Sequence, residues 1–109
     1  MPGHAWTIVL GAEAERDFSN VIDWTTENFG PRQAERYADL VLAAIDAIAQ
    51  DPCSARSRER SEIGKGYRTL HLSRPGRHFV LYRQGDADAI VIVRILHDSM
   101  ELSRHVPED

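Results

Sequence analysis

The fold is decided by the stretch from residue 30 to residue 52, which reads GPRQAERYADLVLAAIDAIAQDP. Its apolar residues recur every three or four positions, the spacing of one face of an α-helix. Gly30 suits the end of a preceding helix, Pro31 suits the first turn of a new one, and Pro52 stops it. The sequence therefore predicts a long amphipathic helix, with a buried stripe made of Ala34, Tyr37, Ala38, Val41, Leu42, Ile45, Ile48 and Ala49.

Before this helix the sequence predicts a strand and another helix. Residues 6–10, WTIVL, are aromatic and β-branched and are closed by Gly11. From Ala12 the period becomes helical, and acidic residues crowd the first turns, where they face the positive end of the helix dipole. Because only a short corner separates the two helices, we expect an antiparallel hairpin. The apolar stripe of the first helix consists of Ala14, Phe18, Val21, Ile22, Thr25 and Phe29.

After the helices the sequence predicts a loop and a three-stranded meander. Residues 53–66 are polar and rich in Arg, Ser and Glu, which is typical of a loop. Strands are predicted over 67–72, 78–83 and 89–96, separated by turn sequences, and the last is nearly all apolar, as in an interior strand. The tail over 99–105 is at most a short helical turn. The order β-α-α-β-β-β predicts an α+β fold, with the helical hairpin on one face of a small, mainly antiparallel sheet.

Length and composition are those of one soluble globular domain spanning residues 1–109, with 42% hydrophobic and 28% charged residues. The single cysteine, Cys53, has no partner for an internal disulfide and suits a reducing compartment. The first residues lack the apolar run of a signal peptide, and no stretch is long enough to cross a bilayer. We therefore expect a cytoplasmic protein that makes no contact with membranes.

Charge is distributed unevenly along the chain. The net charge is −4, but residues 1–52 carry −6, residues 53–85 carry +6 and residues 86–109 carry −4. Proteins that bind phosphates over a wide surface usually have a basic balance throughout. The basic middle with acidic flanks favours one anionic partner surface over general nucleic-acid binding.

The sequence contains no spacing typical of a catalytic, metal or cofactor site. Its five histidines form no HxH or HxxxH pair, and Gly64-Lys65-Gly66 lacks the long pattern of a phosphate loop. We therefore predict no catalytic residue, metal or cofactor. What remains is a group of cationic and aromatic residues on and after the meander, the types that anchor protein interfaces: Tyr67, Arg68, Arg74, Arg77, His78, Tyr82, Arg83, Arg94, His97 and Arg104.

Four motifs, in the same order, resemble those of ParE-like toxins of bacterial toxin–antitoxin systems. The similarity extends from about Trp6 to Val106. The matching segments are Gly30-Pro31-Arg32-Gln33-Ala34-Glu35-Arg36-Tyr37, Glu62-Ile63 with Gly66-Tyr67-Arg68, Gly76-Arg77-His78-Phe79-Val80-Leu81-Tyr82-Arg83, and Ile92-Val93-Arg94-Ile95-Leu96-His97-Asp98 with Arg104-His105-Val106.

The resemblance implies the RelE/ParE fold and a toxin of stress response or plasmid maintenance, neutralised by a small antitoxin. ParE members are taken to block DNA gyrase, whereas RelE members cleave messenger RNA in the ribosomal A site. Because both branches share one fold, fold alone does not choose between them.

The residues at the positions that resemble the RelE catalytic set favour the ParE branch. By matching strands, the RelE lysines fall on Arg68 and Leu70, and the third-strand arginine falls on Phe79. The final segment offers Arg104, but no tyrosine follows Tyr82. Leu and Phe do no proton chemistry, so most of a metal-independent ribonuclease site is missing. The alternatives are a RelE-like ribosome-dependent mRNA endonuclease and a non-toxic antitoxin-binding homologue.

The resemblance also implies the partners: a ParD-like antitoxin in a hetero-oligomer, DNA gyrase, and DNA contacted only through the antitoxin. We expect the acidic antitoxin tail to fold over the groove between helices and sheet. The predicted antitoxin-binding residues are Tyr67, Arg68, Arg77, His78, Tyr82, Arg83 and Arg94. The predicted target-binding residues are Arg94, His97 and Arg104.

Overall fold

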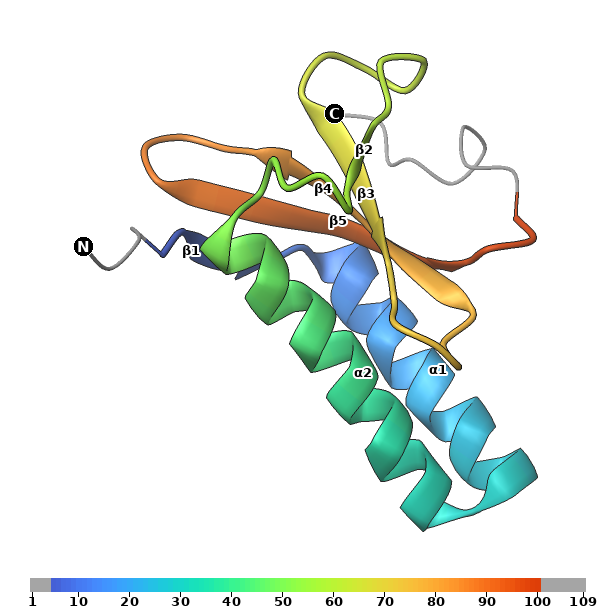
Figure 1. Ribbon diagram of the computed structural model, residues 1–109. Helices are drawn as coiled ribbons and strands as arrows, with labels where there is room; N and C mark the ends of the chain where they lie inside the picture. The colour runs from blue at the N-terminus through green and yellow to red at the C-terminus, as the bar shows by residue number, and fades with distance from the viewer. Residues whose placement is uncertain (1–4, 101–109) are drawn as a thin grey trace.

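The computed structural model describes residues 5–100 and places two antiparallel helices on one face of a five-stranded sheet (Figure 1). This arrangement confirms the predicted α+β fold. The elements, in chain order, are β1 (Thr7–Leu10), α1 (Ala12–Phe29), α2 (Pro31–Gln50), β2 (Arg58–Glu59), β3 (Tyr67–His71), β4 (His78–Gln84) and β5 (Ala89–His97).

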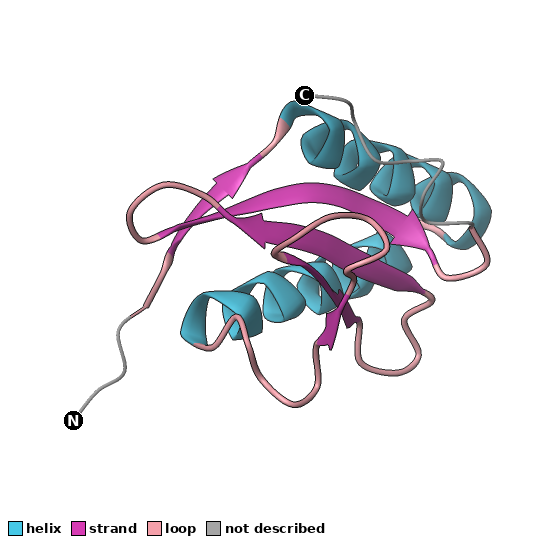
Figure 2. Cartoon of the chain, turned by 90° about the horizontal axis from the view of Figure 1, so that it is seen from above, coloured by secondary structure: helices cyan, strands magenta, loops and turns pink. Residues whose placement is uncertain are grey.

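The strands lie in the order β1-β5-β4-β3-β2. Only β1 and β5 pair in parallel, and the other neighbours pair antiparallel. Parallel neighbours cannot be joined by a tight turn, and here the helices and the strands β2 to β4 all lie between β1 and β5 in the chain. Seen from above in Figure 2, the strands cross over the more distant helices. As the sequence predicted, β5 is an interior strand, lying between β1 and β4.

A single residue, Gly30, joins the two helices. It has φ +91° and ψ 167°, a region that is essentially restricted to glycine, and its N–H donates to the Thr26 carbonyl oxygen at 2.9 Å. Pro31 occupies the first helical position of α2, where no intrahelical N–H bond is lost. The prediction that Gly30 ends the first helix and that Pro31 begins the second is confirmed.

The core lies between the helices and the sheet. Val41 and Ile48 of α2, Val80 of β4 and Ile92 of β5 are all at most 1% exposed. Most of the predicted helical stripes face this core, but Leu42 is 52% exposed. The prediction was wrong there because α2 is covered along only one side, and Leu42 lies a full 100° around the helix from Val41.

The sequence prediction also missed one strand. Within the predicted loop over 53–66, Arg58–Glu59 form a two-residue edge strand that pairs with β3. The segment has no apolar alternation, so its strand state depends on backbone pairing, which continues in the 2.8 Å bond from Arg60 N–H to the Tyr67 carbonyl oxygen. The predicted helical turn over 99–105 lies largely outside the described residues. In the described part of the chain, neither helix has the length and apolar character needed to cross a membrane.

Candidate functional site

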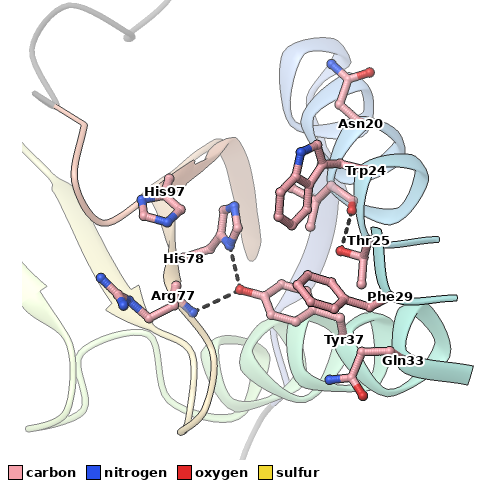
Figure 3. Close-up of a pocket in the computed structure, with 10 residues that line it drawn as sticks. Asn20, Trp24, Thr25, Phe29, Gln33, Tyr37, Arg77, His78 and His97 are labelled. Carbon is pink, nitrogen blue, oxygen red and sulfur yellow. Dashed lines mark hydrogen bonds between the residues drawn. The ribbon is translucent and has the colours of Figure 1, made fainter. Parts of the chain in front are cut away.

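A pocket of about 590 Å³ opens between α1, the start of α2 and the ends of β4 and β5 (Figure 3). One wall comes from the last turns of α1, and the facing wall comes from the strand ends. The volume falls in the range of sites that hold small molecules or a few side chains. The lining residues are Asn20, Val21, Trp24, Thr25, Phe29, Gln33, Tyr37, Arg77, His78 and His97.

The α1 wall carries two exposed aromatic side chains. Trp24 is 58% exposed and Phe29 is 65% exposed, and their rings meet edge to face with centroids 5.7 Å apart. The sequence had predicted Phe29 as core and had not singled out Trp24. Adjacent exposed aromatics that line a pocket are typical of a surface that binds a partner.

The facing wall is organised by the hydroxyl group of Tyr37. The backbone N–H of Arg77 donates to this oxygen at 2.9 Å, and the hydroxyl lies against Nδ1 of His78 (Figure 3). The Tyr37 oxygen thus accepts one hydrogen bond from Arg77 and shares a second one with Nδ1 of His78, in which the donor is set by the tautomer of the ring.

Burial keeps His78 uncharged. Two causes lower the pKa of His78 to about 4. The larger is loss of solvent around the ring, and the smaller is the neighbouring His97, whose ring centroid lies 5.2 Å away. Burial also raises the pKa of Tyr37, so its hydroxyl stays protonated. The floor of the pocket is thus neutral at physiological pH.

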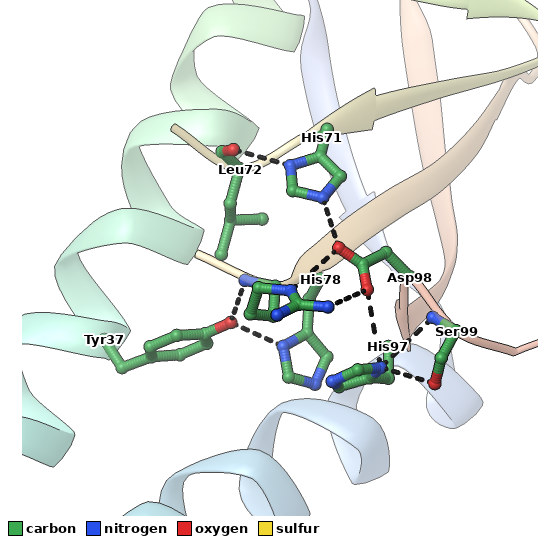
Figure 4. Close-up of polar contacts among 8 residues, drawn as sticks. Tyr37, His71, Leu72, His78, His97, Asp98 and Ser99 are labelled. Atoms are coloured by element: carbon green, nitrogen blue, oxygen red, sulfur yellow. Dashed lines mark hydrogen bonds and ion pairs between the residues drawn. The ribbon is translucent and has the colours of Figure 1, made fainter. Parts of the chain in front are cut away.

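Asp98, directly after β5, does not line the pocket itself, but its carboxylate binds the side chain of the lining residue Arg77, and we call this cluster the mouth (Figure 4). Arg77 donates from Nε at 3.2 Å and from Nη2 at 3.3 Å, His71 donates from Nε2 at 2.9 Å, and His97 Nδ1 lies 3.6 Å away. These groups, Arg77 first and then His71, lower the pKa of Asp98 to about 2.

Both ring nitrogens of His71 face acceptors. Nε2 faces Asp98, and Nδ1 lies 2.7 Å from the carbonyl oxygen of Leu72. Two acceptors require two N–H donors, which is the imidazolium form. The bond to Asp98 and then that to Leu72 accordingly raise the pKa of His71. With Arg77, two cations therefore surround one carboxylate, and the mouth has a positive excess.

The structure brings only some of the predicted binding residues together. Arg77, His78 and His97 meet at the pocket. Arg83 lies six residues from Arg77, about 20 Å along β4, and pairs with Tyr67 of β3. The arginines of the meander are therefore spread along β4 and do not all lie at the pocket.

Three other predicted residues have positions that were not foreseen. Arg94 is 17% exposed and forms a two-pronged ion pair with Asp17 of α1, with Nε to Oδ2 at 2.7 Å and Nη2 to Oδ1 at 2.9 Å. Tyr82 is buried and donates its hydroxyl proton to the carbonyl oxygen of Pro52. Arg68 binds the hydroxyl of Ser57. Arg104 lies outside the described residues.

Sequence reasoning missed four members of the site: Trp24, Tyr37, His71 and Asp98. Tyr37 was predicted only as a core residue, and Trp24 was not part of the predicted stripe. His71 and Asp98 are 27 residues apart, so no local spacing could have joined them. Tyr37 and Asp98 both stand in motifs of the family resemblance, whereas no signal pointed to Trp24 or His71 as site residues.

Known proteins resemble this chain over nearly its whole length. The family described as the ParE toxin of type II toxin-antitoxin system, parDE, matches residues 8–102. The chain belongs to this family. Toxin ParE1 of Mycobacterium tuberculosis is 33% identical over 98 residues, covering 90% of this chain and 95% of that protein. Toxin RelE3 of Caulobacter vibrioides is 31% identical over 91 residues, covering 84% of this chain and 92% of that protein.

A solved structure confirms the RelE/ParE fold. The chromosomal ParDE toxin–antitoxin system from P. aeruginosa contains a chain that superposes with a TM-score of 0.71 at 21% identity, covering 87% of this chain and 98% of that one. The family match and the fold together make the chain a toxin of the ParE/RelE superfamily, from a type II toxin–antitoxin system.

Acidification is expected to destabilise the protein through His78. The unfolded ring takes up a proton near its ordinary pKa of 6.5, whereas the folded ring does so only at about 4. Between these two pH values the unfolded state therefore binds more protons than the folded state, so the free energy of unfolding decreases as the pH falls. We expect His78→Gln to reduce the loss of stability between pH 7.5 and pH 5 by roughly 1–2 kcal/mol, measured by urea unfolding.

His71→Gln is the matched control for this pH effect. The pKa of His71 is raised in the folded state. Its stabilising contribution is therefore fully present below the ordinary pKa of 6.5 and is lost as the pH rises through the folded-state pKa. This variant should therefore make acidification more destabilising than in the unmodified protein. Equal pH slopes for both variants and the unmodified chain would contradict the assignment of a neutral His78.

Proposed function

We propose that this toxin inhibits DNA gyrase by binding it, without chemistry of its own, and that a ParD-like antitoxin neutralises it in a cytoplasmic hetero-oligomer that contacts DNA only through the antitoxin. The match to the ParE family over residues 8–102 and the similarity to Toxin ParE1 support this proposal. The observation that carries it is the pocket, in which exposed aromatic rings face a cationic mouth, as in a surface that anchors another protein.

The positions that would carry RelE-type chemistry also favour a binding protein. Leu70 and Phe79, which stand where the RelE resemblance places a lysine and an arginine, are both buried side chains without a titratable group. A ribonuclease needs a base for the 2′-hydroxyl and cations for the phosphorane at such positions. The relatives include Toxin RelE3, so RNA cleavage is the second candidate to test.

The predicted residues divide into two proposed contact areas and a supporting group. Arg77, His78 and His97 belong to the pocket. Tyr67, Arg68 and Arg83 form a second proposed antitoxin contact at the other end of β3 and β4. Tyr82 and Arg94 support these areas from within the fold, through Pro52 and Asp17. For the gyrase contact, the proposal keeps the strand end at His97 together with Arg104.

The decisive experiment is DNA supercoiling by purified gyrase as the toxin is titrated in. We expect a dose-dependent loss of supercoiling with accumulation of cleaved DNA, and recovery when the antitoxin is added. If gyrase is unaffected at large molar excess, ribosome profiling after induction separates the alternatives. Cleavage of messages in the A site would favour the RelE branch, and induction without growth arrest would favour a non-toxic homologue.

A further inference from the structure

We infer that the pocket binds an apolar side chain of the antitoxin that lies next to a carboxylate, and that Arg77 and His71 hold this carboxylate at the mouth. The inference rests on the proposed function, because it takes the antitoxin as the occupant. Beyond that function, the pocket is the part of the toxin that binds, and an apolar side chain beside a carboxylate is what the antitoxin presents to it.

The aromatic wall of the pocket is open to solvent. Trp24 and Phe29 each expose more than half of their surface, although the rest of the molecule buries its other large aromatic residues within the described chain wholly or in part. The two rings touch each other and face the cavity (Figure 3). Covering them removes a large apolar area from water, the main driving force for association. A volume of about 590 Å³ leaves room for a large apolar side chain and its neighbours.

The charge at the mouth of the pocket suits a carboxylate. The Asp98 carboxylate is bound by the Arg77 guanidinium and by the His71 imidazolium, so one negative charge meets two positive ones. The Arg77 side chain is 68% exposed and His71 is also open to solvent. A guanidinium holds carboxylates through its planar fork, and two of its five N–H donors are engaged with Asp98. The excess charge therefore favours an acidic partner group.

One set of bonds holds both parts of the site. The Tyr37 hydroxyl accepts the backbone N–H of Arg77 and is hydrogen-bonded to His78, so the neutral floor and the start of β4 are fixed to α2. The side chain of the same Arg77 binds Asp98 at the mouth. The apolar and cationic parts are thus held at a set spacing before the partner arrives, which lowers the entropic cost of binding.

Tryptophan fluorescence tests the occupancy of the pocket directly. The chain has two tryptophans, so Trp6→Phe leaves Trp24 as the only one. When the cognate antitoxin, purified from the co-expressed complex, is added to this variant, we expect a blue shift of the emission and weaker quenching by acrylamide. A complex seen by size-exclusion chromatography without any change in Trp24 emission would overturn the inference.

Affinity measurements on matched variants test the two parts of the site. We expect Trp24→Ala to weaken antitoxin binding by about 30-fold or more, and Arg77→Gln by about 10-fold. The controls are Leu42→Ala, an exposed apolar residue outside the pocket, and Arg16→Gln. The Arg16 side chain is 67% exposed and also pairs with an acid, Glu13, so it matches Arg77 closely. Both controls should bind within about threefold of the unmodified toxin, and circular dichroism checks that every variant is folded.

The outcomes separate this inference from the proposed function. If the pocket variants bind as tightly as the controls, the antitoxin lies elsewhere on the toxin and the inference is wrong, while gyrase inhibition by the unmodified chain is unaffected. If the unmodified toxin neither inhibits gyrase nor binds the antitoxin, the proposed function itself fails. A double variant, Trp24→Ala with Arg77→Gln, should lose more affinity than either single variant, as expected for two contacts to one segment.

Discussion

Replacing Asp17 with alanine is expected to lower the free energy of unfolding by about 3–5 kcal/mol, because it removes the carboxylate that pairs in two places with the largely buried Arg94 guanidinium and also accepts a backbone N–H. Asp17 Oδ2 accepts from Arg94 Nε at 2.7 Å and from the backbone N–H of Ile95 at 2.9 Å. The side chains of Asp17 and Arg94 are 13% and 17% exposed, so water can replace few of the hydrogen bonds that the substitution removes. Pairing between β1 and β5 ends at Ile92, and beyond that point Asp17 accepts the backbone N–H of Ile95 in β5.

Chemical denaturation of three variants measures this effect. Asp23→Ala removes an exposed acid from the same helix and should change stability by less than about 0.5 kcal/mol. The double variant Asp17→Leu with Arg94→Met removes both charges and should recover much of the loss, since a buried ion pair contributes little beyond its apolar replacement. A loss below about 1 kcal/mol in Asp17→Ala would show that the ion pair with Arg94 does not support β5.

The second large effect is expected from Ile48→Ala, with a loss of about 2–5 kcal/mol. Ile48 is 1% exposed and belongs to the core cluster that joins α2 to the sheet. Its truncation leaves a cavity that the surrounding helices and strands fill only in part. The matched control is Leu42→Ala on the same helix, which removes an exposed side chain and should cost much less. Equal losses for the two variants would contradict the burial pattern of α2.

Both changes are large relative to a typical stability of about 5–15 kcal/mol for a small domain. The Asp17 variant also bears on the site, because the strand that it supports ends at His97 and leads into Asp98. Loosening this strand end should disturb the mouth of the pocket before it disturbs the helical hairpin. The Ile48 variant, in contrast, should weaken the whole fold cooperatively.

The secondary structure was largely predictable because it depends on neighbours along the chain. The helical period fixed α1 and α2, and Gly30 with Pro31 marked the corner between them. Alternation and turn residues located β3, β4 and β5. The two-residue strand β2 was not predictable in this way, since it is held by pairing with β3 and not by a pattern of its own.

The site was decided by tertiary structure. Tyr37 and His78 are 41 residues apart, and His71 and Asp98 are 27 apart, so no local pattern encodes either contact. The sequence alone identified the cationic and aromatic residue types and a family whose members bind other proteins. The strand order, in which β5 lies between β1 and β4, determined which of those residues meet. Arg77, just before β4, lies at the pocket, whereas Arg83 lies near the other end of this seven-residue strand, too far away to share one small site.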